Sequence, residues 1–321
     1  MKTKILISLL ALVAVAGCTV PGIPGITTIT TIAGVKGLEI TSFTAEPNTV
    51  YTGNTVRVLM ETQNQGGSTA YNASSFAYLT GSNMNLSGSS GGMYWTGKDL
   101  ADKTECQYFL KDMKPADVVR GTEGDTKLFK WNLVAPNVTA GQTRNDIFIG
   151  RVYTDYETGV NGNVWIYTEA EADAAKASGR ALNKGTFSST SGPIGVEVSV
   201  SPDPVIIYGT DKSLTLNIKI SNLAAGTIYK SGVVKNCNVT LTTDDLNRVK
   251  VTVTAPDLNL TGTDCATADK EQELVAGRPT TVFCDVTIKG DVTTFKSVPI
   301  NVKVKYGYFT ERTASVTVQG K

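Results

Sequence analysis

The sequence contains one β-rich module twice. The segment from Gly37 reads GLEITSFTAEPNTVYTGNTVRVLMETQNQGGSTAYN, and the segment from Gly195 reads GVEVSVSPDPVIIYGTDKSLTLNIKISNLAAGTIYK. Each has a short alternating strand, a turn with proline, a second alternating strand, and then an asparagine followed by small residues. Asn64 and Asn222 occupy the same place in the two copies, 158 positions apart. A repeat of this length indicates two homologous domains and not a short solenoid.

The copies agree again near their ends. RVYTDYETGVNGNVWIY begins at Arg151 and KVKYGYFTERTASVTV at Lys303, so that Tyr156 matches Tyr308 at an offset of 152. Because the offset changes so little, the copies differ mainly in loops. We therefore expect two tandem domains, 37–168 and 193–321, each with its own core and each able to fold alone.

Apolar and polar residues alternate along many segments. In 214–220 leucine and isoleucine take one face and polar residues the other, and 282–288 repeats the pattern. Alternation with a period of two, interrupted by turn residues, predicts half-buried antiparallel strands. The expected fold class is all-β, with two tandem Ig-like β-sandwich domains.

The first copy also carries a recognisable motif. It fits the pattern PxxVxxGxxVxVxxxxxNxG with Pro47, Val50, Gly53, Val56, Val58, Asn64 and Gly66. This arrangement resembles the Ig-like modules of the CARDB type on archaeal and bacterial cell surfaces, and the two-copy plan resembles archaeal S-layer-like proteins. The second copy departs from the pattern with Ala224 in place of Gly66. The resemblance implies the fold more strongly than any activity.

The N-terminus reads as an export signal. Lys2 and Lys4 precede a mostly apolar run over 5–16, which is too short to span a bilayer comfortably and suits a signal-peptide core. We therefore expect residues 1–17 to be a signal peptide.

The signal ends in small residues followed by Cys18. This resembles the lipobox of exported lipoproteins, which implies cleavage before Cys18, lipid on its sulfur, and anchoring at the extracellular face of the membrane. The alternative is an ordinary signal peptide with an incidental cysteine. Residues 18–36, a mixture of Pro, Gly and Thr, are expected to form a stalk.

Four cysteines remain after Cys18, and export permits disulfides. We favour Cys265 with Cys284, because the first lies in a polar loop that leads into the strand of the second. Cys237, in the strand-like VVKNCNVTLTT, has core-facing parity and is the rival partner for Cys284. Cys106 would then pair with Cys265 only if the two domains touch.

An Ala-rich stretch separates the copies. Acids in its first turn and Lys176 near its end predict a helix over 169–178, within a linker over 169–192. It is expected to be either a solvated linker helix or a spacer docked on the first domain.

Exposed aromatic residues are the best sequence candidates for binding. Tyr94 and Trp95 lie in a Gly- and Ser-rich stretch over 80–100, where rings could stack on sugars or a partner, or fold back over their own sheet. Trp131 and Trp165 are expected to pack in strands or lie on a sheet surface. Five N-x-[ST] triplets are possible glycosylation sites: Asn72, Asn85, Asn137, Asn238 and Asn259.

Several kinds of chemistry have no support in the sequence. Histidine is absent, which removes the commonest general base and metal ligand, and no close-set cysteine pairs suggest zinc. Asp244 and Asp245, with Asp211 and Asp264, lack a calcium-loop spacing and read as solvated turns. No nucleotide or hydrolase motif appears, and a net charge of +1 argues against nucleic acid. We expect no enzyme activity, metal or cofactor.

The expected function is that of a lipid-anchored surface scaffold, adhesion or envelope interaction protein. Its partners would be membrane lipid, through Cys18, and other envelope proteins or glycans. The alternatives are a lipoprotein that captures sugar or peptide, and a filament subunit joined by strand exchange through the Thr-rich N-terminal segment.

Overall fold

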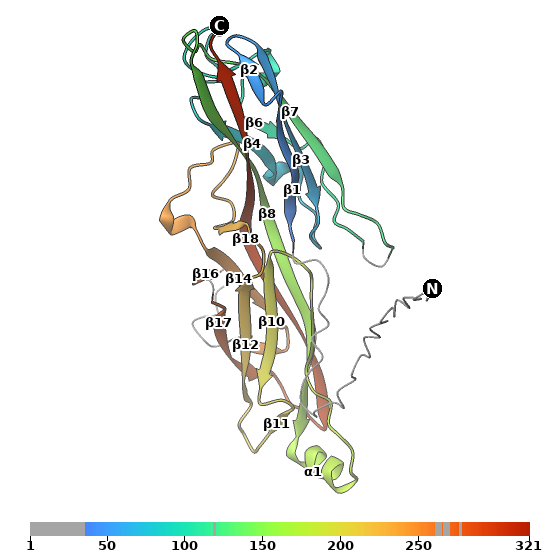
Figure 1. The fold of residues 1–321 in the computed structure, drawn as a ribbon. Helices are drawn as coiled ribbons and strands as arrows, with labels where there is room; N and C mark the ends of the chain where they lie inside the picture. Colours follow the sequence, from blue (N-terminus) through green and yellow to red (C-terminus); the bar gives the residue numbers. More distant parts are fainter. Residues whose placement is uncertain (1–35, 118–119, 261–264, 266–269, 276–277) are drawn as a thin grey trace, which may run out of the picture. The chain divides into compact units, whose positions relative to one another are not determined.

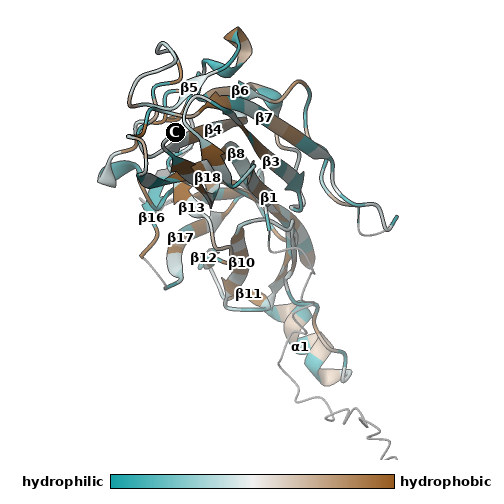
Figure 2. Ribbon diagram, turned by 45° about the horizontal axis from the view of Figure 1, so that its top comes forward, coloured by the Kyte–Doolittle hydropathy of each residue, from teal (hydrophilic) through white to brown (hydrophobic). Residues whose placement is uncertain are grey.

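The computed structural model describes residues 36–117, 120–260, 265, 270–275 and 278–321. The predicted signal peptide, Cys18, Asp264 and almost all of the predicted stalk lie outside these residues. The described part is all-β, as expected, with strands in three sheets and a single α-helix (Figure 1). In Figure 2 the apolar residues, in brown, are concentrated on the strands, whereas the loops are mostly teal or pale.

The strands fall into two groups joined by two long strands. The first group is β1 (Leu38–Glu46), β2 (Thr49–Tyr51), β3 (Thr55–Asn64), β4 (Phe76–Gly81), β5 (Thr96–Gly97), β6 (Cys106–Tyr108) and β7 (Thr126–Val134). The second is β9 (Thr186–Ser189), β10 (Ile194–Ser201), β11 (Val205–Ile207), β12 (Ser213–Asn222), β13 (Thr227–Tyr229), β14 (Arg248–Thr254), β15 (Leu258–Leu260), β16 (Lys270–Glu273) and β17 (Thr280–Ile288). The long strands are β8 (Thr143–Thr168) and β18 (Phe295–Gln319), and short 3-10 helices occur at η1 (Asn72–Ser74), η2 (Leu100–Asp102) and η3 (Thr243–Asp245).

The two long strands pair with each other along nearly their whole length. β8 has 26 residues and β18 has 25, and their antiparallel register runs from Thr143 opposite Gln319 to Tyr167 opposite Phe295. Strands of this length are far longer than the usual five or six residues. Each of them enters both groups of strands.

Each group forms a sandwich with one part of this long pair. In the first, the sheet β1-β3-β7-β5 packs on β4 and on parts of β8 and β18, with a core that joins Met60 and Trp131 to Phe148 and Val316. In the second, the sheet β10-β12-β17-β15 packs on β14 and on the other parts of the long strands. Alternation of buried and exposed residues along β12 confirms the predicted strand over 214–220.

The sandwiches do not coincide with the expected domains 37–168 and 193–321. Val164 and Ile166, from the end of β8, lie in the core of the second sandwich, whereas Val316 and Val318, from the end of β18, lie in the core of the first. The ends of the two long strands are thus exchanged between the sandwiches. Short parallel strands extend this exchange, because β2 pairs with the end of β18 and β11 with the end of β8. The described residues from 36 onward accordingly form one compact unit.

The repeated asparagine has a structural role. Asn64 is fully buried; its side-chain amide donates to the carbonyl oxygens of Ser68 (2.9 Å) and Met113 (2.8 Å), and its Oδ1 accepts from the N–H of Gly66 (3.2 Å). In the second copy, Asn222 Oδ1 accepts from the N–H of Ala224 at 3.3 Å. Both asparagines therefore shape the turn that follows a long strand.

The departure at Ala224 also has a physical reason. A Cβ on Gly66 would lie 1.7 Å from the hydroxyl of Tyr156, so the tyrosine requires glycine there. The matching Tyr308 packs instead on Gly226, where a Cβ would lie 2.4 Å from its ring. The second copy thus keeps the tyrosine–glycine contact but moves the glycine two residues along the chain.

The helix α1 (Glu169–Ala177) confirms the prediction from composition. Thr168 caps it, because its Oγ1 accepts from the N–H of Glu171 at 3.3 Å, and Gly179 follows with φ +71°. Ala175 is 1% exposed, and α1 lies against β8 and β11. Neither expectation is met in full: most of the helix is exposed, as in a solvated linker, and its one buried residue lies against strands of the second sandwich and not of the first. No helix in the described ranges is long and apolar enough to cross a membrane.

Candidate functional site

The predicted aromatic binding loop is mostly exposed, but its tryptophan belongs to the core. Trp95 is completely buried and meets the ring of Phe148 edge to face, with 5.0 Å between ring centroids. Of the two possibilities, Trp95 follows the second: its ring folds back onto the sheet and is not available to a ligand. Tyr94 beside it is 49% exposed.

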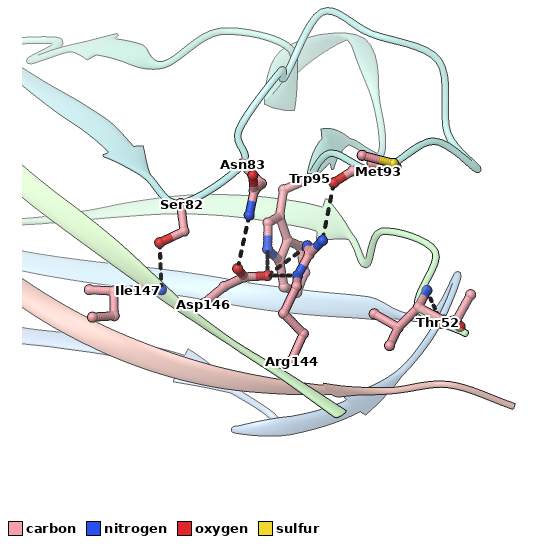
Figure 3. A network of polar contacts seen from close by, with 9 residues as sticks. Thr52, Ser82, Asn83, Met93, Trp95, Arg144, Asp146 and Ile147 are labelled. Carbon is pink, nitrogen blue, oxygen red and sulfur yellow. Dashed lines mark hydrogen bonds and ion pairs between the residues drawn. The ribbon is translucent and has the colours of Figure 1, made fainter. Parts of the chain in front are cut away.

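A buried carboxylate holds Trp95 in place (Figure 3). Asp146 is 1% exposed, and its Oδ2 accepts from Trp95 Nε1 at 2.9 Å and from Arg144 Nη2 at 2.8 Å. Arg144 also reaches the carbonyl oxygen of Met93, at 3.3 Å, and Asn83 donates to Oδ1 at 3.4 Å. Because Trp95, Arg144 and Asn83 all bond to the one buried carboxylate, this network stabilises the loop.

The predicted Cys265–Cys284 disulfide is confirmed, with 5.4 Å between the two Cα atoms. It lies in the core of the second sandwich, where Cys284 is fully buried. The rival pairing of Cys237 with Cys284 is thereby excluded.

A second disulfide joins the two sandwiches. Cys106 in β6 is bonded to Cys237, 131 positions later, with 5.9 Å between their Cα atoms. The prediction that Cys237 lies in a core-facing strand is wrong, because it lies in an irregular segment with φ +64°. Two disulfides are typical of proteins that fold outside the reducing cytosol.

Aromatic rings fill the space beside this disulfide. Tyr153, from β8, stacks on Phe76 with 5.3 Å between centroids and lies 5.0 Å from Phe309 of β18. Tyr229, from the second copy, meets Tyr153 edge to face at 6.1 Å. Together with Cys106 these residues form a small third core at the junction of the sandwiches.

The outward face of the long pair carries a polar groove at and beyond this junction. Along β8 the apolar residues Val160 and Val164 point into the second core, so Asn161 and Asn163, at the alternate positions, face outward. Two adjoining hollows, of about 530 and 470 Å³, open on this face and share Asn161 and Asn301. We call this surface the outer groove; residues that define it are Asp155, Glu157, Asn161, Asn163, Asn301, Lys303 and Lys305.

The charges of the outer groove are paired. Glu157 lies 3.3 Å from Lys303 Nζ and 3.9 Å from Lys305 Nζ. Burial raises the pKa of the Asp155 carboxyl above its ordinary value, although the N–H of Gly232, at 3.2 Å from its Oδ1, acts in the opposite direction. The groove therefore has no strong excess of either charge.

Aromatic rings lie at one end of the same face. Trp165 follows Asn161 and Asn163 at every second position of β8 and is only partly buried. Its ring is 6.0 Å from that of Phe295, which is 53% exposed. Trp165 is thus a sheet-surface aromatic, one of the two expectations, whereas Trp131 is fully buried.

The remaining candidates, the glycosylation asparagines and the aspartates, do not form a common site. The five N-x-[ST] asparagines are all exposed, and whether they carry glycans stays a prediction. Asp244 and Asp245 lie in η3, and the hydroxyl and N–H of Thr242 hold the pKa of Asp245 below its ordinary value. Among the described residues, no group of three or more acidic or cysteine side chains could hold a metal ion.

Sequence reasoning missed the outer groove. Its residues alternate with core residues in the segment from Arg151, and this alternation was the available signal. Asn161 and Asn301 meet only because β8 and β18 pair in one register, and their side-chain amides are hydrogen-bonded to each other.

Comparisons with known proteins assign no family. No protein-family model matches the chain, and no curated protein matches it. Similar solved structures include Salmonella alpha-2-macroglobulin, with 9% identity over 90% of this chain and a TM-score of 0.24. Another is Escherichia coli alpha-2-macroglobulin activated by porcine elastase, with 10% identity over 89% and a TM-score of 0.23. This chain spans 17% of the first and 22% of the second, and a likeness this weak carries no functional conclusion.

Proposed function

We propose that this protein is a non-enzymatic, lipid-anchored protein of the cell surface, whose two sandwiches act together as a stiff scaffold or adhesion module of the envelope. The observation that carries the proposal is the ladder between β8 and β18, which passes through both cores. The resemblance to CARDB-type surface modules agrees with this proposal.

The shared strands make bending at the junction costly. Tandem domains joined by a flexible linker reorient freely, whereas here a bend would have to break paired strands and the aromatic core around Tyr153. The Cys106–Cys237 disulfide adds a covalent link between the same two parts. A stiff unit of this kind suits a protein that holds a binding surface in a fixed orientation.

Anchoring rests on the N-terminal pattern. The disulfides support export, and the small residues before Cys18 support lipid attachment. One acyl chain holds a protein only marginally, so firm anchoring needs a second lipid group.

A second candidate function is the capture of sugar or peptide for a transporter. The outer groove favours it in part, because it offers polar groups on an exposed face. Small-molecule sites usually enclose most of their ligand, whereas this groove is open. The scaffold therefore remains the better-supported function.

Fractionation tests the anchor. The native chain is expected in the membrane fraction, and Cys18→Ser in the medium, with Thr19→Ser as the matched control that stays with the membrane. Retention of Cys18→Ser, together with an intact mass that shows no lipid on the native Cys18, would overturn the anchoring.

Spin-label distances test the stiffness. Labels at Leu128→Cys and Phe283→Cys, both on exposed strand positions of different sandwiches, are expected to give one narrow distance distribution. Labels at Leu128→Cys and Ile147→Cys, within one sandwich, set the reference width. A clearly broader distribution for the first pair would contradict a stiff junction.

A further inference from the structure

We propose that the outer groove binds a neutral glycan chain. The inference deepens the proposed function, since it names the partner that the stiff module would hold, and it rests on that function only for the place where the glycan is met. The binding chemistry follows from the groove itself.

The groove offers amides where sugars offer hydroxyls. Asn161, Asn163 and Asn301 each present both a donor and an acceptor, and a sugar hydroxyl needs both. Hydroxyl side chains from the neighbouring strands β9 and β14 extend the same chemistry: Thr186, Ser188 and Thr254. Such a surface suits a polyhydroxylated ligand better than an apolar one.

Charge pairing excludes a strongly charged polymer. The two lysines of the groove face Glu157, so no unopposed row of cations is available for phosphate or sulfate groups. A polyanion would have to displace Glu157 from the two lysines, and a polycation would be repelled by Lys303 and Lys305. A neutral chain avoids both of these electrostatic costs.

The aromatic end supplies a stacking surface. The partly exposed ring of Trp165 lies on the same face as the asparagines, next to Phe295. An indole ring combines a large apolar face with a polar N–H, and can pack on the C–H face of a sugar ring. Trp95 and Trp131 are fully buried and cannot do so.

The length and openness of the groove favour a polymer. From Asp155 to Trp165 the strand rises by about 33 Å, at about 3.3 Å per residue, which is room for several sugar rings in a row. A peptide would be recognised mainly by main-chain hydrogen bonds at a sheet edge. On this face the backbones of β8 and β18 already pair with each other, so only side chains are available.

Quenching of tryptophan fluorescence tests the proposal, because Trp165 is the one of the three tryptophans with solvent access. The full chain, in micelles of a detergent without a sugar head group, is titrated with neutral hexasaccharides: cellohexaose, xylohexaose, mannohexaose and chitohexaose. At least one is expected to protect Trp165 from acrylamide and to shift the emission to shorter wavelength. Trp165→Phe should abolish both signals.

Variants of the groove identify the site. The double variant Asn161→Ala/Asn301→Ala is expected to weaken binding at least about tenfold, which corresponds to the loss of one or two good hydrogen bonds. Asn217→Ala, on the outward face of β12, is the matched control and should bind as the native chain does. If the double variant fails to fold by circular dichroism, Asn301→Ser takes its place.

Three outcomes would overturn the proposal: no protection by any neutral hexasaccharide, equal protection in the groove variant, or protection only by a sulfated hexasaccharide or a Ser/Thr-rich peptide. Each is independent of the fractionation experiment, because a chain that fails to anchor can still bind sugar. A chain that anchors without binding sugar would retain the scaffold function and lose this inference.

Discussion

Asp155 of β8 lies directly opposite Gly307 of β18, and the two residues are 152 positions apart in the sequence. That separation equals the offset by which Tyr308 repeats Tyr156. The pair therefore marks a local two-fold axis between the long strands. This axis relates the pair Tyr156–Tyr306 to the pair Tyr308–Thr154. Each copy of the module sends the end of its last strand into the sandwich of the other.

Separate halves should not fold. Residues 37–168 alone would expose Val164 and would lack Val316, which completes the first core. We expect neither 37–168 nor 193–321 to show a cooperative melt alone, whereas an equimolar mixture regains one as a one-to-one complex. Calorimetry and analytical ultracentrifugation measure this, and two cooperative melts from isolated halves would contradict the exchange.

The disulfide between the sandwiches should be the more stabilising of the two. In the chain-entropy model, closing 131 positions contributes about 5 kcal/mol and closing 19 about 3 kcal/mol to the free energy of unfolding. Urea unfolding of Cys106→Ala/Cys237→Ala is expected to show the larger loss. Cys265→Ala/Cys284→Ala is the matched comparison, and the reverse order would count against this assignment.

Removal of the buried carboxylate should destabilise the first sandwich. Asp146→Ala leaves the Trp95 indole N–H without its partner and the Arg144 guanidinium without its ion pair, at a cost of about 3–5 kcal/mol in the free energy of unfolding. Asp291→Ala removes an ion pair whose carboxylate is 95% exposed, and should cost at most about 1 kcal/mol. Similar losses in the two variants, measured by urea unfolding, would show that the network is unimportant.

The junction carboxyl should give a measurable pH dependence. Because burial raises the pKa of Asp155 in the folded chain, the folded state binds more protons than the unfolded state between the two pKa values, so its contribution to stability falls as pH rises. The stability of Asp155→Asn relative to the native chain should therefore increase from about pH 4 upward and level off above the raised pKa.

Asp211→Asn is the control with the opposite sign. Hydrogen bonds from Ser213 lower the pKa of Asp211, so this carboxylate adds stability above its ordinary pKa and loses it on acidification. The stability of the variant relative to the native chain should therefore decrease as pH rises. Urea unfolding across a pH series measures both trends, and parallel curves for the two variants would contradict the assigned shifts.

The local elements of the fold could be predicted from the sequence, but their partners could not. Alternation along 214–220 predicts a strand because burial of one face is a local property, and the acids and Lys176 predict α1 in the same way. Val164 has the same alternating neighbours whether it fills its own sandwich or the other one. Only the long-range pairing of strands decides which sandwich Val164 fills, and the periodicity of the sequence carries no information about that pairing.

The candidate site could not be predicted from the sequence for the same reason. Trp95 has Gly- and Ser-rich neighbours that suggest an exposed loop, but its partner Asp146 lies 51 positions away. Cys237 sits in an alternating segment, yet its bond is to Cys106 in the other copy. The outer groove arises from two strands that are 152 positions apart, so neither strand alone shows a binding surface.

The parallel pairing of β2 with the end of β18 also fixes an order of events during export. A chain that crosses the membrane N-terminus first delivers β2 and β1 long before the residues around Val318, which close their core. The first sandwich therefore stays incomplete until Val316 and Val318 have crossed the membrane. Completion of translocation thus becomes the trigger for closing the first sandwich, whereas the second core ends at Tyr308 and needs no later residue.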